Sequence, residues 1–255
     1  SHTDVGDRAN DNLRINGGDI NAKVIGEGAN LGVTQKARIE YALKGGRANA
    51  DFVDNSGGVD CSDHEVNIKI LLSDVMRNSK MDTKSRNKLL DKMQDEVSDL
   101  VIRNNYQQTQ AISLSESKAA TYIETHIALI RQLEKSGLLN RAVEFLPSDD
   151  EIQERIKDKK GLTRPELAIL TSYSKIRLFN ELLEGELLNS DAVNESWLKT
   201  YFPTQLQKKY EANIEDHKLR KQIIATDLSN SMVNRMGFAF TQMMQDKTGA
   251  NTDKI

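Results

Sequence analysis

Two short stretches hold the residue types from which a binding site for a polar small molecule can be built. The first, Gly26 to Asn30, places two glycines and an asparagine directly after apolar residues. The second begins at Asn55, continues through Gly57-Gly58 and is followed by Ser62. Asparagine offers donors and acceptors that suit a carboxamide or hydroxyl group, and glycine lets a ligand approach the backbone closely. Both stretches therefore predict ligand binding, and no residue of the chain is assigned to a chemical step.

Each stretch is expected to be a turn between a strand and a helix. Lys23–Gly26 is predicted to form a strand, and Thr34 to begin a helix that ends at Gly45-Gly46. Ala50–Val53 is predicted to form a second strand, and the turn Asn55–Gly58 to lead into the next helix. The crossover in such a β-α-β-α unit favours parallel strands. Ligands of parallel sheets bind where the strands end, so both turns should lie at one edge.

From Lys84 onward the spacing of apolar residues predicts helices alone, with capping boxes at Ser148–Glu151 and Thr163–Glu166. The loop from Arg77 to Thr83 is the expected boundary. The predicted fold class is therefore an α/β piece, a partial Rossmann-type unit, followed by an all-α region, and the chain should be predominantly helical. Two strands are too few for a complete doubly wound sheet, so we expect the chain to be part of a longer protein.

Composition excludes several classes of function. Lys and Arg total 35 against 38 Asp and Glu, a net charge of −3, so no basic face for nucleic acid is expected. No apolar run approaches the roughly 20 residues of a membrane span, and no signal peptide is apparent. Cys61 is the only cysteine, so no disulfide or cysteine metal site is expected. We predict a cytoplasmic protein that binds neither membrane nor nucleic acid.

These residues allow two other interpretations. The spacing of Gly26, Gly28 and Gly32 resembles a phosphate-binding glycine loop, but the carboxylate of Glu27 would repel a pyrophosphate. A tight structural turn is the second possibility, and a turn that presents Asn30 to a neutral ligand group is the one we favour. Asp60, Cys61, Asp63 and His64 crowd neighbouring positions of one helix start and would not converge on an ion, so no metal site is predicted.

The chain resembles the C-terminal region of the large, bacterial NAD-specific glutamate dehydrogenases. The resemblance runs along nearly the whole chain and is most specific in the first 75 residues. It is carried by these phrases: Gly6-Asp-Arg-Ala-Asn-Asp-Asn-Leu13, Glu27-Gly-Ala-Asn30, Gly32-Val-Thr-Gln-Lys-Ala-Arg-Ile-Glu-Tyr-Ala-Leu43, Asn55-Ser-Gly-Gly-Val59-x-x-Ser62-x-x-Glu65 and Leu162-Thr-Arg-Pro-Glu-Leu-Ala168.

The resemblance implies a role for each matching position. Residues 1–80 would be the C-terminal part of a Rossmann-like, NAD-binding domain, and residues 81–255 an all-helical C-terminal region. Val59 and Ser62 would line the glutamate pocket, with the Ser62 hydroxyl on a substrate carboxylate and the amides of a helix start after Val59 assisting it. Ser56 stands where smaller family members often carry alanine. The residues implied in binding the cofactor, NAD, are Asn30, Asn55, Gly28, Gly57 and Gly58.

The implied reaction is the oxidation of L-glutamate to 2-oxoglutarate and ammonia, a step of amino-acid catabolism. The family's catalytic lysine and aspartate and its phosphate-binding turn would lie upstream, so the isolated chain should be inactive. The complete enzyme is expected to be a homo-oligomer. One alternative is a related dehydrogenase acting on leucine, valine or phenylalanine, against which Glu27 before Gly-Ala-Asn argues. The other is a non-catalytic helical interaction or regulatory module.

Overall fold

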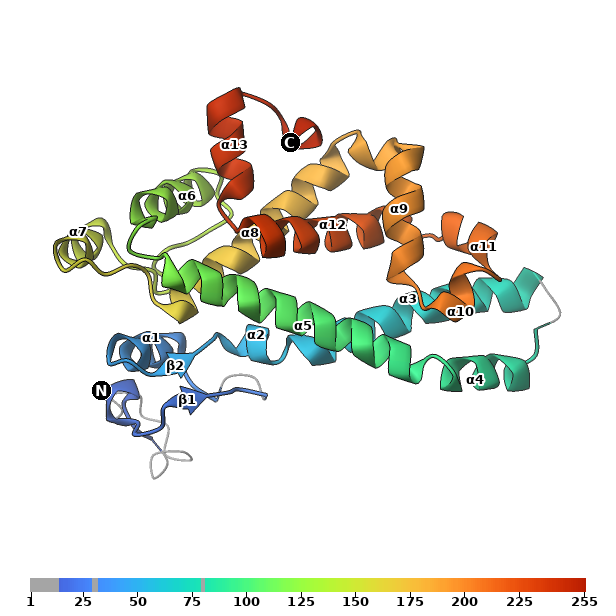
Figure 1. Cartoon of the computed structure of the whole chain (residues 1–255), viewed down its shortest axis with the longest axis horizontal. Helices are drawn as coiled ribbons and strands as arrows, with labels where there is room; N and C mark the ends of the chain where they lie inside the picture. Colours follow the sequence, from blue (N-terminus) through green and yellow to red (C-terminus); the bar gives the residue numbers. More distant parts are fainter. Residues whose placement is uncertain (1–13, 29–31, 79–80) are drawn as a thin grey trace. The chain divides into compact units, whose positions relative to one another are not determined.

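The computed structural model describes residues 14–28, 32–78 and 81–255, and most of these residues are helical (Figure 1). Within them the chain divides into two compact units, the described residues up to 55 with 112–173, and the described residues of 56–111 with 174–255. The elements in chain order are β1 (Val24–Ile25), α1 (Gln35–Leu43), β2 (Arg47–Ala48), α2 (Asp51–Asp54), α3 (Ser56–Asn78), α4 (Thr83–Asp91), α5 (Gln94–Ser117), α6 (Ile123–Lys135), α7 (Asp149–Lys157), α8 (Arg164–Glu184), α9 (Asp191–Tyr201), α10 (Thr204–Gln207), α11 (Glu211–Glu215), α12 (Arg220–Met236) and α13 (Phe240–Thr248), with short 3-10 turns at Gly17–Asp19, Leu187–Asn189 and Thr252–Lys254.

The first predicted strand, the helix after it and the parallel pairing are confirmed, although the second strand lies at other residues than predicted. Strands β1 and β2 pair in parallel, with Val24 opposite Arg47 and Ile25 opposite Ala48. Helix α1 connects them, and the Thr34 hydroxyl caps it by accepting the N–H of Ala37 at 3.2 Å. The predicted end of this helix is also confirmed, because α1 stops at Leu43 and Gly45 has a φ of +93°. Among the described residues this pair is the whole sheet, which leaves a Rossmann-type unit unconfirmed.

The predicted second strand and the turn after it are wrong. Ala50–Val53 is not a strand: β2 ends at Ala48, and Asp51 begins the short helix α2. Ala50 and Val53 are both buried whereas Phe52 is exposed, a three-residue spacing that belongs to a helical turn. Asn55 keeps a helical conformation, with φ −92° and ψ −7°, so α3 follows at once. Gly57 and Gly58 therefore lie in the first turn of a helix and not in a loop.

The first unit also holds α6, α7 and the beginning of α8. Ile123, Ile127 and Ile152 form a buried cluster between α6 and α7. The predicted capping box at Ser148 is confirmed, with the Ser148 hydroxyl accepting the N–H of Glu151 and the Glu151 carboxylate accepting the N–H of Ser148. At α8 the carboxylate of Glu166 accepts both the N–H and the hydroxyl of Thr163, which fixes the start of that helix.

The second unit is built around α3, α9, α11 and α12. Its core contains large apolar side chains of α3 and of the segment after α9, among them Leu71, Leu72 and Phe202, each 1% exposed. Helix α9 packs on α11 and α12, and α11 contacts α3. The bounds of the two units differ from the division near residue 80 expected from the sequence, and that division stays a prediction about the parent protein.

Two features are absent from the described part of the chain. None of its helices has the length and apolar character that a membrane span requires. It also contains no group of three or more His, Cys, Asp or Glu side chains placed to hold a metal ion.

Candidate functional site

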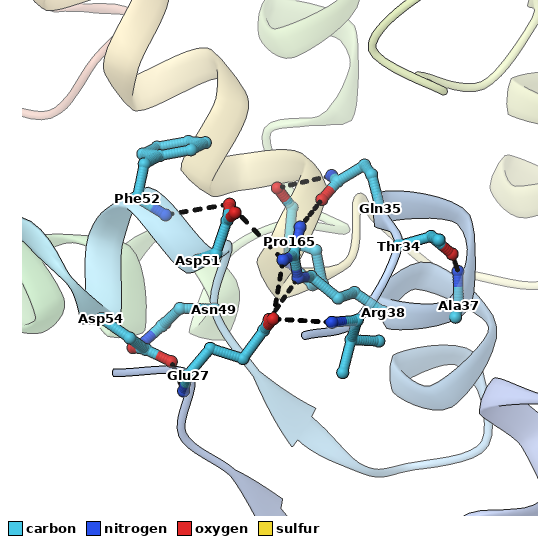
Figure 2. A network of polar contacts seen from close by, with 11 residues as sticks. Glu27, Thr34, Gln35, Ala37, Arg38, Asn49, Asp51, Phe52, Asp54 and Pro165 are labelled. Atoms are coloured by element: carbon cyan, nitrogen blue, oxygen red, sulfur yellow. Dashed lines mark hydrogen bonds and ion pairs between the residues drawn. The ribbon is translucent and has the colours of Figure 1, made fainter. Parts of the chain in front are cut away.

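The turn after β1 is fixed by a buried ion pair between Glu27 and Arg38. The Arg38 guanidinium donates from Nε to Oε2 of Glu27 at 2.5 Å and from Nη2 to Oε1 at 2.9 Å (Figure 2). Glu27 is 7% exposed and Arg38 4% exposed. The same carboxylate accepts the N–H of Val33 at 2.8 Å, at the far end of the turn. Glu27 thus points inward and closes the turn, so its charge is matched by Arg38 and not presented to a ligand.

Two side chains at the end of α2 are hydrogen-bonded to the backbone at the beginning of this turn, one as an acceptor and one as a donor. Oδ2 of Asp54 accepts the N–H of Glu27 at 2.9 Å (Figure 2). The side-chain amide of Asn55 donates to the carbonyl oxygen of Gly28 at 2.8 Å. A third side chain, Asn49, holds the other oxygen of Asp54 through its Nδ2 at 2.6 Å. The turn after β1 and the α2–α3 junction are therefore one hydrogen-bonded structure.

These contacts bring together two residues that the sequence singles out, Gly28 and Asn55. Gly28 is exposed, and a Cβ atom added to it or to Gly26 would meet nothing within 4 Å. Asn55 is half-buried, and within the described residues its Oδ1 has no hydrogen-bond partner. Asn30 lies outside the described residues. The surface beside the turn thus offers an open stretch of backbone next to an amide acceptor.

Val59 and Ser62 lie three residues apart on α3 and therefore share a face of that helix. Both are exposed, Val59 by 68%, as is Gly58. Gly57 faces α5 instead, where an added Cβ would lie 3.4 Å from Nδ2 of Asn105. Because α3 begins at Ser56, the helix start expected after Val59 is absent, and the amides expected to assist a carboxylate there are inside a helix. Any carboxylate at this face would depend on the Ser62 hydroxyl.

Comparison with known proteins places the chain in a family. Residues 1–115 match the family model described as "Bacterial NAD-glutamate dehydrogenase, catalytic domain", and residues 159–255 match "Glutamate dehydrogenase, C-terminal". The chain belongs to the bacterial NAD-glutamate dehydrogenase family. The site residues described above all fall within the first of these matched regions.

Three curated relatives, each named "NAD-specific glutamate dehydrogenase", align along nearly the whole chain. The protein from Pseudomonas aeruginosa is 49% identical over 255 residues, which is 100% of this chain and 16% of the relative. That from Halomonas elongata is 45% identical over 256 residues, 99% of this chain and 16% of the relative. That from Mycobacterium tuberculosis is 43% identical over 249 residues, 98% of this chain and 15% of the relative. The chain spans about one sixth of the length of these glutamate dehydrogenases.

In this member of the glutamate dehydrogenase family, a polar network on a second face of α3 anchors the helix that carries Val59 and Ser62. The hydroxyl of Tyr201, at the end of α9, donates to Oδ2 of Asp63 at 2.7 Å and accepts Nδ2 of Asn67 at 2.9 Å. The ring of His64 stacks on that of Tyr201 with centroids 4.4 Å apart. Burial lowers the pKa of His64 below its ordinary value and raises the pKa of Tyr201 well above its own. Both groups therefore stay neutral at pH 7 and serve packing.

The acidic and sulfur side chains next to this network differ in their exposure and in their partners. His64 is 2% exposed and faces Tyr201, whereas Cys61 is exposed. Asp60 turns toward α5, where Nδ2 of Asn104 donates to it at 2.9 Å. Burial raises the pKa of Asp60 above its ordinary value. Nε2 of His64 lies 3.7 Å from Oδ1 of Asp60, so these two side chains stay close together, whereas Cys61 is exposed.

Sequence reasoning missed the residues that hold the candidate site in place, namely Arg38, Asn49 and Asp54. No spacing rule reveals them, because their partners come from different elements. The one available signal was an unpaired acidic residue, Glu27, in a turn that should be buried at a strand end. Such a charge requires a cation nearby, and Arg38 lies in the helix that follows.

Proposed function

We propose that this chain is a segment of an NAD-dependent glutamate dehydrogenase. The complete enzyme would convert L-glutamate, NAD and water to 2-oxoglutarate, ammonia and NADH. The observation that carries the proposal is the junction of the two Gly- and Asn-rich turns, where Asn55 holds Gly28 and leaves an open backbone beside its amide. Because the family is NAD-dependent, the ligand expected at this junction is the carboxamide of NAD, which needs hydrogen-bonding partners of this kind.

The residues present fit the nicotinamide end of NAD. Its carboxamide carries two N–H donors and one acceptor, and Oδ1 of Asn55 is an acceptor without a partner in the described part of the chain. The exposed backbone at Gly28 would lie against the ring or its ribose, with Asn30 in the same turn. NAD supplies the hydride acceptor when bound. This chain's own contribution is to bind and orient that group.

For the substrate we propose the exposed face of α3 that carries Val59 and Ser62. The Ser62 hydroxyl would donate to a carboxylate of glutamate, and Val59 would contact its aliphatic carbons. Gly58 is exposed at the first turn of the helix and would permit close approach of the cofactor, whereas Gly57 faces α5. The anchoring of α3 by Tyr201 supports this assignment, since a substrate-binding helix has to be held at a fixed position.

Several coarser features of the parent protein belong to the same proposal. We expect residues 1–80 to complete a Rossmann-like domain whose other strands and phosphate-binding turn come from upstream sequence. The catalytic lysine and aspartate would be upstream as well, the enzyme would be a cytoplasmic homo-oligomer, and its role would be amino-acid catabolism. The relatives give no support to a leucine, valine or phenylalanine dehydrogenase, or to a non-catalytic module.

The test is an activity measurement on the longest natural protein that contains this segment. Purified protein is assayed for NADH formation with L-glutamate and, separately, with leucine, valine and phenylalanine, each with NAD and with NADP. We expect turnover that requires both L-glutamate and NAD. Preference for a branched-chain or aromatic amino acid would contradict the substrate, and equal use of NADP would contradict the cofactor assignment.

A further inference from the structure

We propose that Arg164 and Asn49 are positioning residues for the turn that meets the cofactor, an inference that rests on the proposed function of that turn. Arg164 is the first residue of α8 and belongs to the phrase Leu162-Thr-Arg-Pro-Glu166, for which the function described above has no use. It lies 115 residues from Asn49 in the sequence, yet the two side chains are hydrogen-bonded within the first unit.

A continuous line of short hydrogen bonds runs from Arg164 to the backbone of the turn. Nε of Arg164 donates to Oδ1 of Asn49 at 2.6 Å. Nδ2 of Asn49 donates to Oδ1 of Asp54 at 2.6 Å. Oδ2 of Asp54 accepts the N–H of Glu27 at 2.9 Å. Asp54 directly precedes Asn55 in the sequence. The line therefore ends at the two residues that are hydrogen-bonded to the backbone at the start of the turn.

Donors and acceptors match at every step of this line. A guanidinium faces the oxygen of the Asn49 amide and a carboxylate faces its nitrogen, so both bonds are assisted by a charge. The side-chain amide of Asn49 accepts through its oxygen on one side and donates through its nitrogen on the other. The position of Asp54 therefore depends on that of α8, because a shift of either would lengthen the Arg164–Asn49 or the Asn49–Asp54 hydrogen bond.

Arg164 is itself held from the far side, which makes it a fixed end for the line. Its Nη1 donates to Oγ of Ser113 at 2.9 Å and to Oε2 of Glu116 at 3.1 Å. The guanidinium is 11% exposed. The neighbouring residue Pro165 adds a second tie, because its carbonyl oxygen accepts Nε2 of Gln35 in α1 at 3.3 Å (Figure 2). The first turn of α8 therefore contacts α1, the last turn of α5 and the segment between β2 and α2.

Exchange of the amide and the carboxylate gives the sharpest test. N49D keeps an acceptor for Arg164 but sets a second carboxylate against Asp54. D54N sets two amide nitrogens against each other, or else loses the acceptor for Glu27. The double variant N49D/D54N restores every bond, since the carboxylate at position 49 accepts from both neighbours and the amide at position 54 donates to it and accepts the N–H of Glu27. Size and total charge are then those of the wild type.

Two readouts follow the variants in the full-length protein. Calorimetry with NADH measures cofactor affinity, and hydrogen exchange without ligand measures the amides of residues 26–34. We expect N49D to weaken NADH binding by about ten- to a hundredfold and to speed exchange in that segment. R164K, which keeps the charge but loses the planar Nε donor, should act in the same direction. N49D/D54N should recover most of both losses. R47Q is the matched control, because Arg47 is 67% exposed and lies 3.8 Å from the same Glu116, so it should change neither.

The outcomes separate this inference from the proposed function. Unchanged exchange and unchanged NADH affinity in both N49D and R164K would overturn the inference. A double variant that binds NADH no more tightly than N49D would also overturn it. The same holds if N49D loses NADH and glutamate affinity equally and its lower melting temperature accounts for both losses. A wild-type protein that binds NADH but does not oxidise glutamate would refute the proposed function alone. In that case recovery by N49D/D54N would still support the positioning role.

Discussion

In the buried ion pair of Glu27 and Arg38, removing the cation should destabilise the fold more than neutralising the anion. In R38M the carboxylate of Glu27, 7% exposed, keeps only the N–H of Val33 and loses the guanidinium that meets both its oxygens. Leaving one member of a buried pair uncompensated costs about 3–5 kcal/mol. In E27Q the guanidinium retains Asp51, 3.4 Å away, and the amide oxygen of Gln35. We therefore expect E27Q to cost about 1–3 kcal/mol.

The double variant E27Q/R38M completes the argument. With both charges gone, no ion is left buried, so the combined loss should be smaller than the sum of the two single losses by about 1–3 kcal/mol. Equilibrium unfolding of the chain in urea, followed by circular dichroism, measures all three variants. K36M is the control, since Lys36 is an exposed cation of the same helix. Additive losses, or an R38M protein as stable as K36M, would refute the interpretation of Glu27 and Arg38 as a coupled pair.

Four side chains give further predictions. In the full-length enzyme, N55A should impair turnover and NAD affinity. S62A should instead raise KM for glutamate by an amount equivalent to about 1.5–3 kcal/mol. Steady-state kinetics measure both effects, and equal losses for NAD and glutamate in each variant would contradict these roles. Burial lowers the pKa of His126 from 6.5 to about 4, so stability should be complete above pH 6.5 and fall by up to about 3 kcal/mol as the pH drops to 4; H126L should flatten that slope in urea unfolding at stepped pH. Burial lowers the pKa of Lys175 to about 8, so the charged form costs stability at pH 7, and K175M should raise the unfolding free energy there by about 1–2 kcal/mol but not above about pH 10.

The elements that the sequence predicts correctly are those with local signals. Thr34 supplies a cap and Gly45 a positive φ, so the bounds of α1 follow from residues within the helix and next to it. Ser148 and Glu151 form a reciprocal cap for the same reason. The parallel pairing of β1 with β2 also follows, because a strand, a helix and a strand in succession favour one crossover.

The wrong second strand shows the limit of such signals. A run of four residues containing Ala50 and Val53 satisfies a strand pattern and a helical turn equally, and the choice depends on which side is buried. Asn55 and the glycines after it are typical of turns, yet the chain remains helical there. Asn55 does contact Gly28, but the helical geometry through which it does so was not predicted.

The contacts that shape the candidate site could not be predicted because they join distant segments. The Glu27–Arg38 pair spans 11 residues and the Arg164–Asn49 bond spans 115. A single sequence contains no periodicity that links such positions. The phrase around Arg164 was recognised as a helix start with a cap, which is correct, but its guanidinium and its partners were not anticipated.

Each unit is built from two separate stretches of the sequence, which limits when it can form during synthesis. The chain passes from one unit to the other three times, after residues 55, 111 and 173, and the last two passages fall inside α5 and α8. A ribosome releasing β1 and α1 therefore delivers Glu27 and Arg38 long before Arg164 emerges. The turn around Glu27 would remain only partly braced until translation reaches the beginning of α8. A cut near residue 80 would therefore leave no intact unit on either side of it.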